Sequence, residues 1–142
     1  MFSLSTAWCS GQEISGDQLL SRISQTGIDH LEIDYRVTPA MLQQMRGPIR
    51  RGEFTVVSVH NYCPLPEGVA LEGVSRFAPP STQDKELRRL AVRHSIKSLQ
   101  LAADLGARVV VFHLGEVEID RQIDELCKWY EQGQIQGSAA QA

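Results

Sequence analysis

The chain has 142 residues, of which 42% are hydrophobic and 22% charged, a balance typical of one soluble globular domain. Its formal net charge of −3 makes nucleic acid and anionic membranes unexpected partners. Three scattered cysteines without a CxxC pair favour reduced thiols and a cytoplasmic location. We expect neither a signal peptide nor a membrane span, because no apolar run approaches about 18 residues.

Apolar runs and helix signals alternate along the chain. Ser15 or Asp17 can cap the first long helix, which Gly27 would close, and Thr38 before Pro39 marks the start of the next, which ends at Gly52. The predicted strands are 2–8, 28–35, 54–61 and 108–114, and the predicted helices are 15–27, 38–52, 84–105 and a segment around 119–130.

A long connection and a long helix precede the last predicted strand. The loop 62–83 holds four of the six prolines, and loops of that length in compact domains are usually functional or mobile. The helix 84–105 carries one narrow polar stripe and is otherwise largely apolar, so we expect it to lie on a sheet between helical neighbours. The stripe consists of Arg89, Arg93, Lys97, Gln100 and Asp104.

Four strand–helix units predict an α/β fold with parallel strands joined by right-handed connections. Four units are half of an eightfold TIM barrel, which takes about 250 residues, although an open four-stranded sheet is also possible. Residues 1–132 would form this half barrel, and the polar tail 133–142 would begin a truncated helical segment. The open edges of a half barrel would allow self-association.

Two of the predicted strands end on a histidine, in Thr55-Val-Val-Ser-Val-His60 and in Arg108-Val-Val-Val-Phe-His113. The carboxyl ends of parallel strands are where α/β folds place their active sites. Imidazole suits divalent ions such as Zn²⁺, so the pair is a candidate metal or acid–base site. The alternative is two core histidines whose ring nitrogens are satisfied by backbone groups.

Side chains alternate along a strand, so residue parity predicts which of them share a face. Glu32 and Asp34 fall opposite the apolar residues of their strand and would join the histidines in the barrel interior, unless they face the helix layer or solvent. The same rule groups Val56 with Ser58 and His60, and Val109 with Val111 and His113.

Other residues with possible chemistry have simpler explanations. Cys63 could form a His-x-x-Cys metal pair with His60, but a lone cysteine after a strand is usually structural. His30 lies at the start of its strand and His94 inside a helix, so both are assigned to structure. Trp8, at the end of the first predicted strand, is equally plausible as a substrate platform and as core filler.

The chain resembles the amino-terminal half of the xylose isomerase-like TIM barrels, which include sugar phosphate isomerases/epimerases and endonuclease IV. The resemblance runs from Phe2 to about Glu118 and rests on the motifs Leu-Glu-Ile-Asp at 31–34, Ser-Val-His-Asn-Tyr-Cys-Pro at 58–64, Ala-Ala-Asp-Leu-Gly-Ala at 102–107 and Val-Val-Val-Phe-His-Leu-Gly at 109–115. Such families take further metal ligands and catalytic carboxylates from strands five to eight. The polypeptide would then be a fragment of a longer product, or a half that associates with another half.

This resemblance implies a metal-dependent sugar (phosphate) isomerase/epimerase, inactive as this half alone. His60 and His113 would bind a divalent metal (Mn²⁺, Mg²⁺ or Zn²⁺) in the complete barrel, with Glu32 as the catalytic candidate and Trp8, Asn61 and Asp34 near the sugar. Endonuclease IV-like zinc phosphodiesterase activity on abasic DNA is the enzymatic alternative. A non-catalytic βα ligand-binding module is the other, although the glycine pattern of a dinucleotide site is missing after the first strand.

Overall fold

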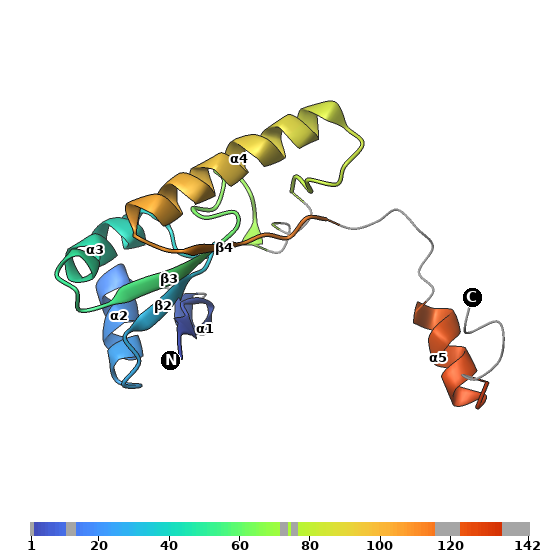
Figure 1. Cartoon of the computed structure of the whole chain (residues 1–142), viewed down its shortest axis with the longest axis horizontal. Helices are drawn as coiled ribbons and strands as arrows, with labels where there is room; N and C mark the ends of the chain where they lie inside the picture. The colour runs from blue at the N-terminus through green and yellow to red at the C-terminus, as the bar shows by residue number, and fades with distance from the viewer. Residues whose placement is uncertain (1, 11–13, 72–73, 75–76, 116–122, 135–142) are drawn as a thin grey trace.

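A computed structural model describes residues 2–10, 14–71, 74, 77–115 and 123–134 (Figure 1). The strands are β1 (Leu4–Ser5), β2 (His30–Ile33), β3 (Thr55–His60) and β4 (Val109–Val111), and the helices are α1 (Ala7–Ser10), α2 (Gly16–Ser24), α3 (Pro39–Arg50), α4 (Lys85–Asp104) and α5 (Ile123–Glu131). No helix in these ranges is long and apolar enough to cross a membrane.

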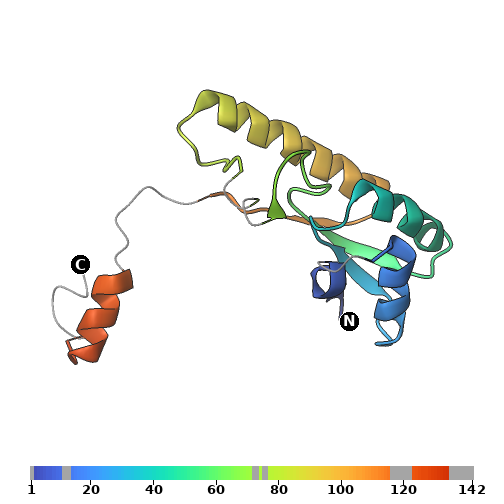
Figure 2. The same cartoon turned by 180° about the vertical axis from the view of Figure 1, so that it is seen from behind.

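The four strands form one parallel sheet in the sequential order β1-β2-β3-β4. Helices α2, α3 and α4 connect successive strands (Figures 1 and 2). Their apolar residues share one core with the sheet. The α/β class and the parallel βα units predicted from the sequence are therefore confirmed for the described part of the chain.

Three helices begin where the sequence predicts their starts. Ser15 caps α2 in a capping box with Gln18, so the alternative cap, Asp17, lies inside the first turn. Thr38 Oγ1 accepts a hydrogen bond from Met41 N at the start of α3, and Asp84 accepts two backbone N–H groups at the start of α4. Each of these caps satisfies N–H groups that have no partner within their helix.

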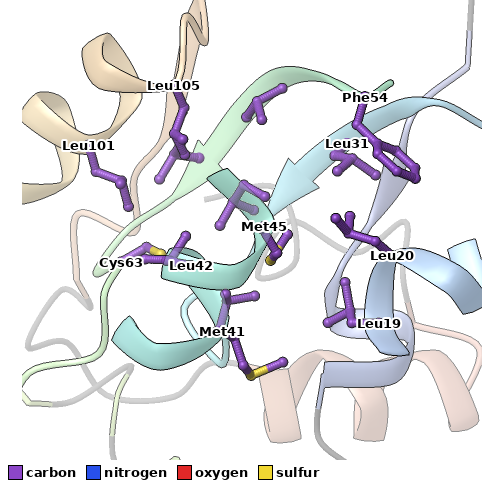
Figure 3. Packing of buried hydrophobic residues seen from close by; sticks show 14 of the residues in the cluster. Leu19, Leu20, Leu31, Met41, Leu42, Met45, Phe54, Cys63, Leu101 and Leu105 are labelled. Carbon is purple, nitrogen blue, oxygen red and sulfur yellow. The ribbon is translucent and has the colours of Figure 1, made fainter. Parts of the chain in front are cut away.

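The hydrophobic core lies between the helices and one face of the sheet (Figure 3). Leu31 and Ile33 of β2 are fully buried against the helices, as their spacing predicts. Leu31 pairs with Val56 but Glu32 pairs with Ser58, so β3 contains one extra residue at this point. This bulge places Val56 in the core, and the predicted grouping of Val56 with Ser58 and His60 on one face is wrong.

All four strands are shorter than predicted, and in β1 and β2 the chain turns before the apolar run ends. After β1 the carbonyl of Thr6 accepts hydrogen bonds from the N–H groups of Cys9 and Ser10, which starts α1. Trp8 therefore lies on a short helix and not at the end of a strand, and 58% of its surface is exposed. A turn from Asp34 to Val37 follows β2, and β4 ends at Val111.

The outer side of α4 differs from the expectation of helical neighbours on both sides. The buried residues Ser98, Leu101 and Ala102 face the rest of the fold. Val92, Ile96 and Leu99 remain about half exposed, so the structure shows an uncovered apolar stripe along α4. The predicted last helix is present as α5 and buries none of its residues. Positions 119–122 of that prediction and most of the predicted tail, 135–142, lie outside the described residues.

Candidate active site

Two histidines meet where β3 and β4 end. His60 is the last residue of β3, and it pairs in register with Val111, the last residue of β4. His113 follows two positions later, and its Nε2 lies 3.1 Å from Nε2 of His60. The ring centroids are 4.9 Å apart with the planes inclined by 54°. The structure thus brings together the two residues that the strand-end pattern singled out.

The distance between the donor atoms of this pair can be compared with the distance between two ligands of one divalent ion. Imidazole nitrogens bind Zn²⁺ at about 2.0–2.1 Å, so two such ligands on one ion lie about 3 Å apart. The observed N···N separation of 3.1 Å is close to that value, and it is also the length of a hydrogen bond between the two rings. Within the described residues, however, no group of three histidine, cysteine or carboxylate side chains is arranged to hold a metal. A complete coordination shell would need further ligands from elsewhere.

A pocket of about 340 Å³ opens beside the histidines. Its lining residues lie at or just after the ends of β2, β3 and β4 and in the described part of the loop 62–83. The lining residues are Asp34, Tyr35, Arg36, His60, Asn61, Tyr62, Val74, Ala78, Pro79 and His113. Described residues of the long proline-rich loop, which was predicted to be functional or mobile, therefore line part of the pocket. Backbone N–H of Ser81 donates to the carbonyl of Leu114 and joins this loop to the segment after β4.

Asp34 lines the pocket but is already engaged with Arg36. Its Oδ1 accepts hydrogen bonds from Nη1 of Arg36 at 2.8 Å and from the backbone N–H of Arg36 at 3.0 Å. The Asp34 side chain is only 4% exposed, which limits its own contact with a sugar. The guanidinium of Arg36 also lies 4.6 Å from the Tyr35 ring centroid. Sequence analysis did not select Arg36, and only its spacing two residues after Asp34 could have indicated it.

Two other predicted site residues lie away from the pocket lining. Glu32 is on the open face of the sheet, where its Oε2 accepts a hydrogen bond from Ser58 Oγ at 3.1 Å. Glu32 precedes Asp34 by two residues, so it lies farther from the carboxyl end of the sheet, where the pocket is. Trp8 on α1 is not among the residues that line this pocket. Of the candidates, His60, His113, Asn61 and Asp34 are brought together, whereas Glu32 and Trp8 are not.

The buried hydroxyl of Ser98 holds the side chain of Asn61 in place. Ser98 of α4 is fully buried, and its Oγ donates to Oδ1 of Asn61 at 2.8 Å and accepts from the backbone N–H of Cys63 at 3.0 Å. Burial, with a smaller contribution from the Asp34 carboxylate, raises the pKa of the Cys63 thiol to about 12. The buried thiol contacts the carbonyl of Asp34, so the geometry favours a structural Cys63 over a His-x-x-Cys metal pair.

An aromatic cluster attaches the loop wall to α4. The rings of Tyr62, Phe77 and His94 contact one another edge-on, with centroid separations of 5.6–6.3 Å. The Tyr62 hydroxyl donates to the carbonyl of Ala78. Burial raises the pKa of Tyr62 and lowers the pKa of His94. His94 thus has the structural role expected for it, on the side of α4 that faces the pocket wall.

His30 lies at the opposite end of β2, outside the pocket with the two histidines. Its Nδ1 is 2.6 Å from a carboxylate oxygen of Asp29, and that hydrogen bond lowers the pKa of Asp29.

Comparisons with protein-family models, curated proteins and solved structures find no match for this chain. The geometry of the pocket is therefore the basis for any functional conclusion.

Proposed function

We propose that this pocket is part of the active site of a metal-dependent sugar (phosphate) isomerase/epimerase. The observation that carries the proposal is the 3.1 Å separation of the two Nε2 atoms of His60 and His113 beside a pocket at the carboxyl end of a parallel sheet. A volume of about 340 Å³ is near the lower end of the range for small-molecule sites, about 300–1,000 Å³.

The arrangement of the sheet supports a half-barrel architecture of the xylose isomerase-like type. Doubly wound sheets reverse their strand order and carry helices on both faces. Here the order is sequential and the helices α2, α3 and α4 share a single core with the sheet. The exposed apolar stripe of α4 and the exposed Val109 on the other sheet face are surfaces that further barrel units, or a second copy of the chain, would cover.

The chain's own residues would have distinct tasks in this site. His60 and His113 would hold the divalent ion, which supplies a Lewis acid that polarises a carbonyl or hydroxyl oxygen of the sugar. Asn61, whose carboxamide oxygen is held by Ser98, would use its amide N–H groups to orient a sugar hydroxyl. Glu32 would support the site without lining the pocket, because the hydrogen bond from Ser58 holds its carboxylate outside the pocket lining. The groups that move the proton would come from outside the described residues.

Metal titration of the full chain tests this proposal. Isothermal calorimetry with Mn²⁺ and with Zn²⁺ should detect one site, and His60→Ala or His113→Ala should weaken it by at least about tenfold, because each variant removes one of two ligands. His30→Ala is the matched control, since it removes a histidine at the other end of the sheet and should leave the affinity unchanged. Equal affinity in all four proteins would exclude the proposed ligands.

Separate measurements test the self-association of the chain and the two alternative functions. Sedimentation velocity should show self-association if a second copy covers the open faces, and a monomer at all concentrations would contradict that. Cleavage of an abasic-site duplex that is lost in His113→Ala would instead favour the endonuclease IV-like alternative. Sugar binding that needs no metal would favour a non-catalytic ligand-binding module.

A further inference from the structure

We propose that Arg36 forms an oxyanion site inside the pocket and selects substrates that carry a phosphate or a carboxylate. The assignment of that anion to a sugar substrate rests on the proposed function, whereas anion binding by Arg36 requires no metal and can be tested alone. Arg36 lies three residues after the end of β2, and its side chain is about one-third exposed at the pocket wall.

The guanidinium is positioned before any ligand arrives. Nη1 donates a hydrogen bond to Oδ1 of Asp34, and the centroid of the Tyr35 ring lies 4.6 Å from the guanidinium carbon. Asp34 is itself held by the Thr6 hydroxyl, which accepts a hydrogen bond from the Asp34 backbone N–H at 2.8 Å. An arginine fixed in this way loses little side-chain entropy when it binds an anion.

The free donors of Arg36 are suited to a two-oxygen ligand. Among the described residues, the guanidinium has no hydrogen-bond partner besides Asp34, so Nε and Nη2 stay without one. These N–H groups lie along one edge of a planar fork that matches the oxygen spacing of phosphate and carboxylate. Asp34 is nearly inaccessible, and therefore the permanently charged group that the pocket presents to a ligand is the cation of Arg36.

The anion site adjoins the histidine pair through one aromatic ring. The ring of Tyr35 contacts the guanidinium on one side and lies 5.6 Å from the ring of His60, measured between centroids. Arg36, Tyr35, His60 and His113 thus form a continuous row along the pocket. A small metabolite could place its oxyanion on Arg36 and its carbonyl or hydroxyl groups at the histidines.

Nuclear magnetic resonance of the arginine Nε–Hε groups tests the site directly. Inorganic phosphate and acetate are titrated separately into the ¹⁵N-labelled full chain, with sodium chloride at equal ionic strength as the reference. The Arg36 signal should shift and saturate with at least one oxyanion, and the stronger response of the two identifies whether phosphate or carboxylate is preferred. Arg36→Gln should weaken the binding by at least about tenfold, because it removes a charge-assisted pair of hydrogen bonds.

Three further variants exclude simpler explanations. Arg50→Gln, at an exposed position on α3, removes the same charge and should leave anion affinity unchanged. Asp34→Asn combined with Arg36→Gln removes both charges, so it leaves no buried unpaired carboxylate if Arg36→Gln alone fails to fold. Arg36→Lys keeps the charge and should retain only part of the affinity.

The outcomes separate this inference from the proposed function. An Arg36 signal that responds to oxyanions no more than that of Arg50 overturns the anion site, even if calorimetry detects the metal. Saturable oxyanion binding that is lost in the Arg36 variants supports the site, even if no metal binds to His60 and His113.

Discussion

Nε2 of His113 lies 3.1 Å from Nε2 of His60, while Nδ1 of His60 is buried and has no hydrogen-bond partner within the described residues. A neutral imidazole carries its proton on one nitrogen, and a buried N–H without an acceptor is less well tolerated than a buried lone pair. The pair therefore has a preferred arrangement, in which His60 donates from Nε2 and His113 accepts.

We expect the metal-free chain to contain His60 as the Nε2–H tautomer and His113 as the Nδ1–H tautomer. Long-range ¹H–¹⁵N correlation spectra of the imidazole rings distinguish the two forms. In His113→Ala, Nδ1 of His60 still has no acceptor, so the His60 ring should keep the Nε2–H form. An Nδ1–H form of His60 in the unmodified chain would contradict this arrangement.

Protonation of His94 should make the free energy of unfolding depend on pH. Burial, followed by the nearby charges of Lys97 and Arg93, lowers its pKa below the ordinary 6.5, and the rings of Tyr62 and Phe77 pack against it. The unfolded chain then binds more protons than the folded one just below pH 6.5. The contribution of His94 to the free energy of unfolding is therefore fully present above that pH. It is lost as the pH falls through the folded-state pKa of His94.

Replacement of His94 by Gln should remove this contribution. Urea unfolding measured at several values between about pH 5 and pH 7 should show a smaller rise in the free energy of unfolding for His94→Gln than for the unmodified chain. Lys97→Gln is an intermediate case, because it removes one charge that depresses the pKa while keeping the histidine. Identical slopes in all three proteins would show that His94 does not titrate as its surroundings indicate.

The three cysteines should differ sharply in reactivity. Cys63 is fully buried with a pKa raised to about 12, and burial also raises the pKa of Cys9, whereas Cys127 is exposed on α5. Thiolates are the reactive species, so a disulfide reagent at about pH 8 should modify one thiol per folded chain. Cys127→Ser should abolish that fast reaction, and all remaining thiols should react in denaturant. A second fast-reacting thiol in the folded chain would contradict the burial of Cys9 or Cys63.

Removal of the Ser98 hydroxyl should destabilise the fold and loosen Asn61. Ser98→Ala leaves the Cys63 N–H and the Asn61 Oδ1 without their buried partner, and the expected cost is about 2 kcal/mol in the free energy of unfolding. Ser21→Ala, at an exposed position on α2, should change stability by less than about 0.5 kcal/mol. Chemical denaturation measures both, and equal stabilities would show that the buried hydrogen bonds of Ser98 contribute little.

Local signals predicted much of the fold because their physical causes act over a few residues. The N-caps at Thr38 and Asp84 satisfy N–H groups of their own helices, so their effect is visible in a short stretch of sequence. Gly52 and Gly106 adopt positive φ just after α3 and α4, as a helix-ending glycine does. The strand bounds were less accurate, because turns such as the one that starts α1 depend on specific hydrogen bonds.

The sequence likewise predicted some features of the candidate site and missed others. Alternation along β2 predicted that Glu32 and Asp34 leave the helix-facing side, and the strand ends predicted the meeting of His60 and His113. The bulge in β3 is invisible in the apolar run, since Val56 and Val57 are the same residue type. The commitment of Asp34 to Arg36 also escaped prediction, because side chains after a strand end are placed by the turn that follows.

The sequence by itself determined the alternation of strands and helices, the parallel sheet and the strand ends at which chemistry is expected. These features follow from short-range hydrogen bonding and from the periodic burial of apolar residues. Only the tertiary structure decided that two histidines 53 positions apart come within 3.1 Å, that Glu32 lies below the pocket and that Arg36 lines it. Those relations depend on strand register and on the packing of a long loop against α4, which no local pattern encodes.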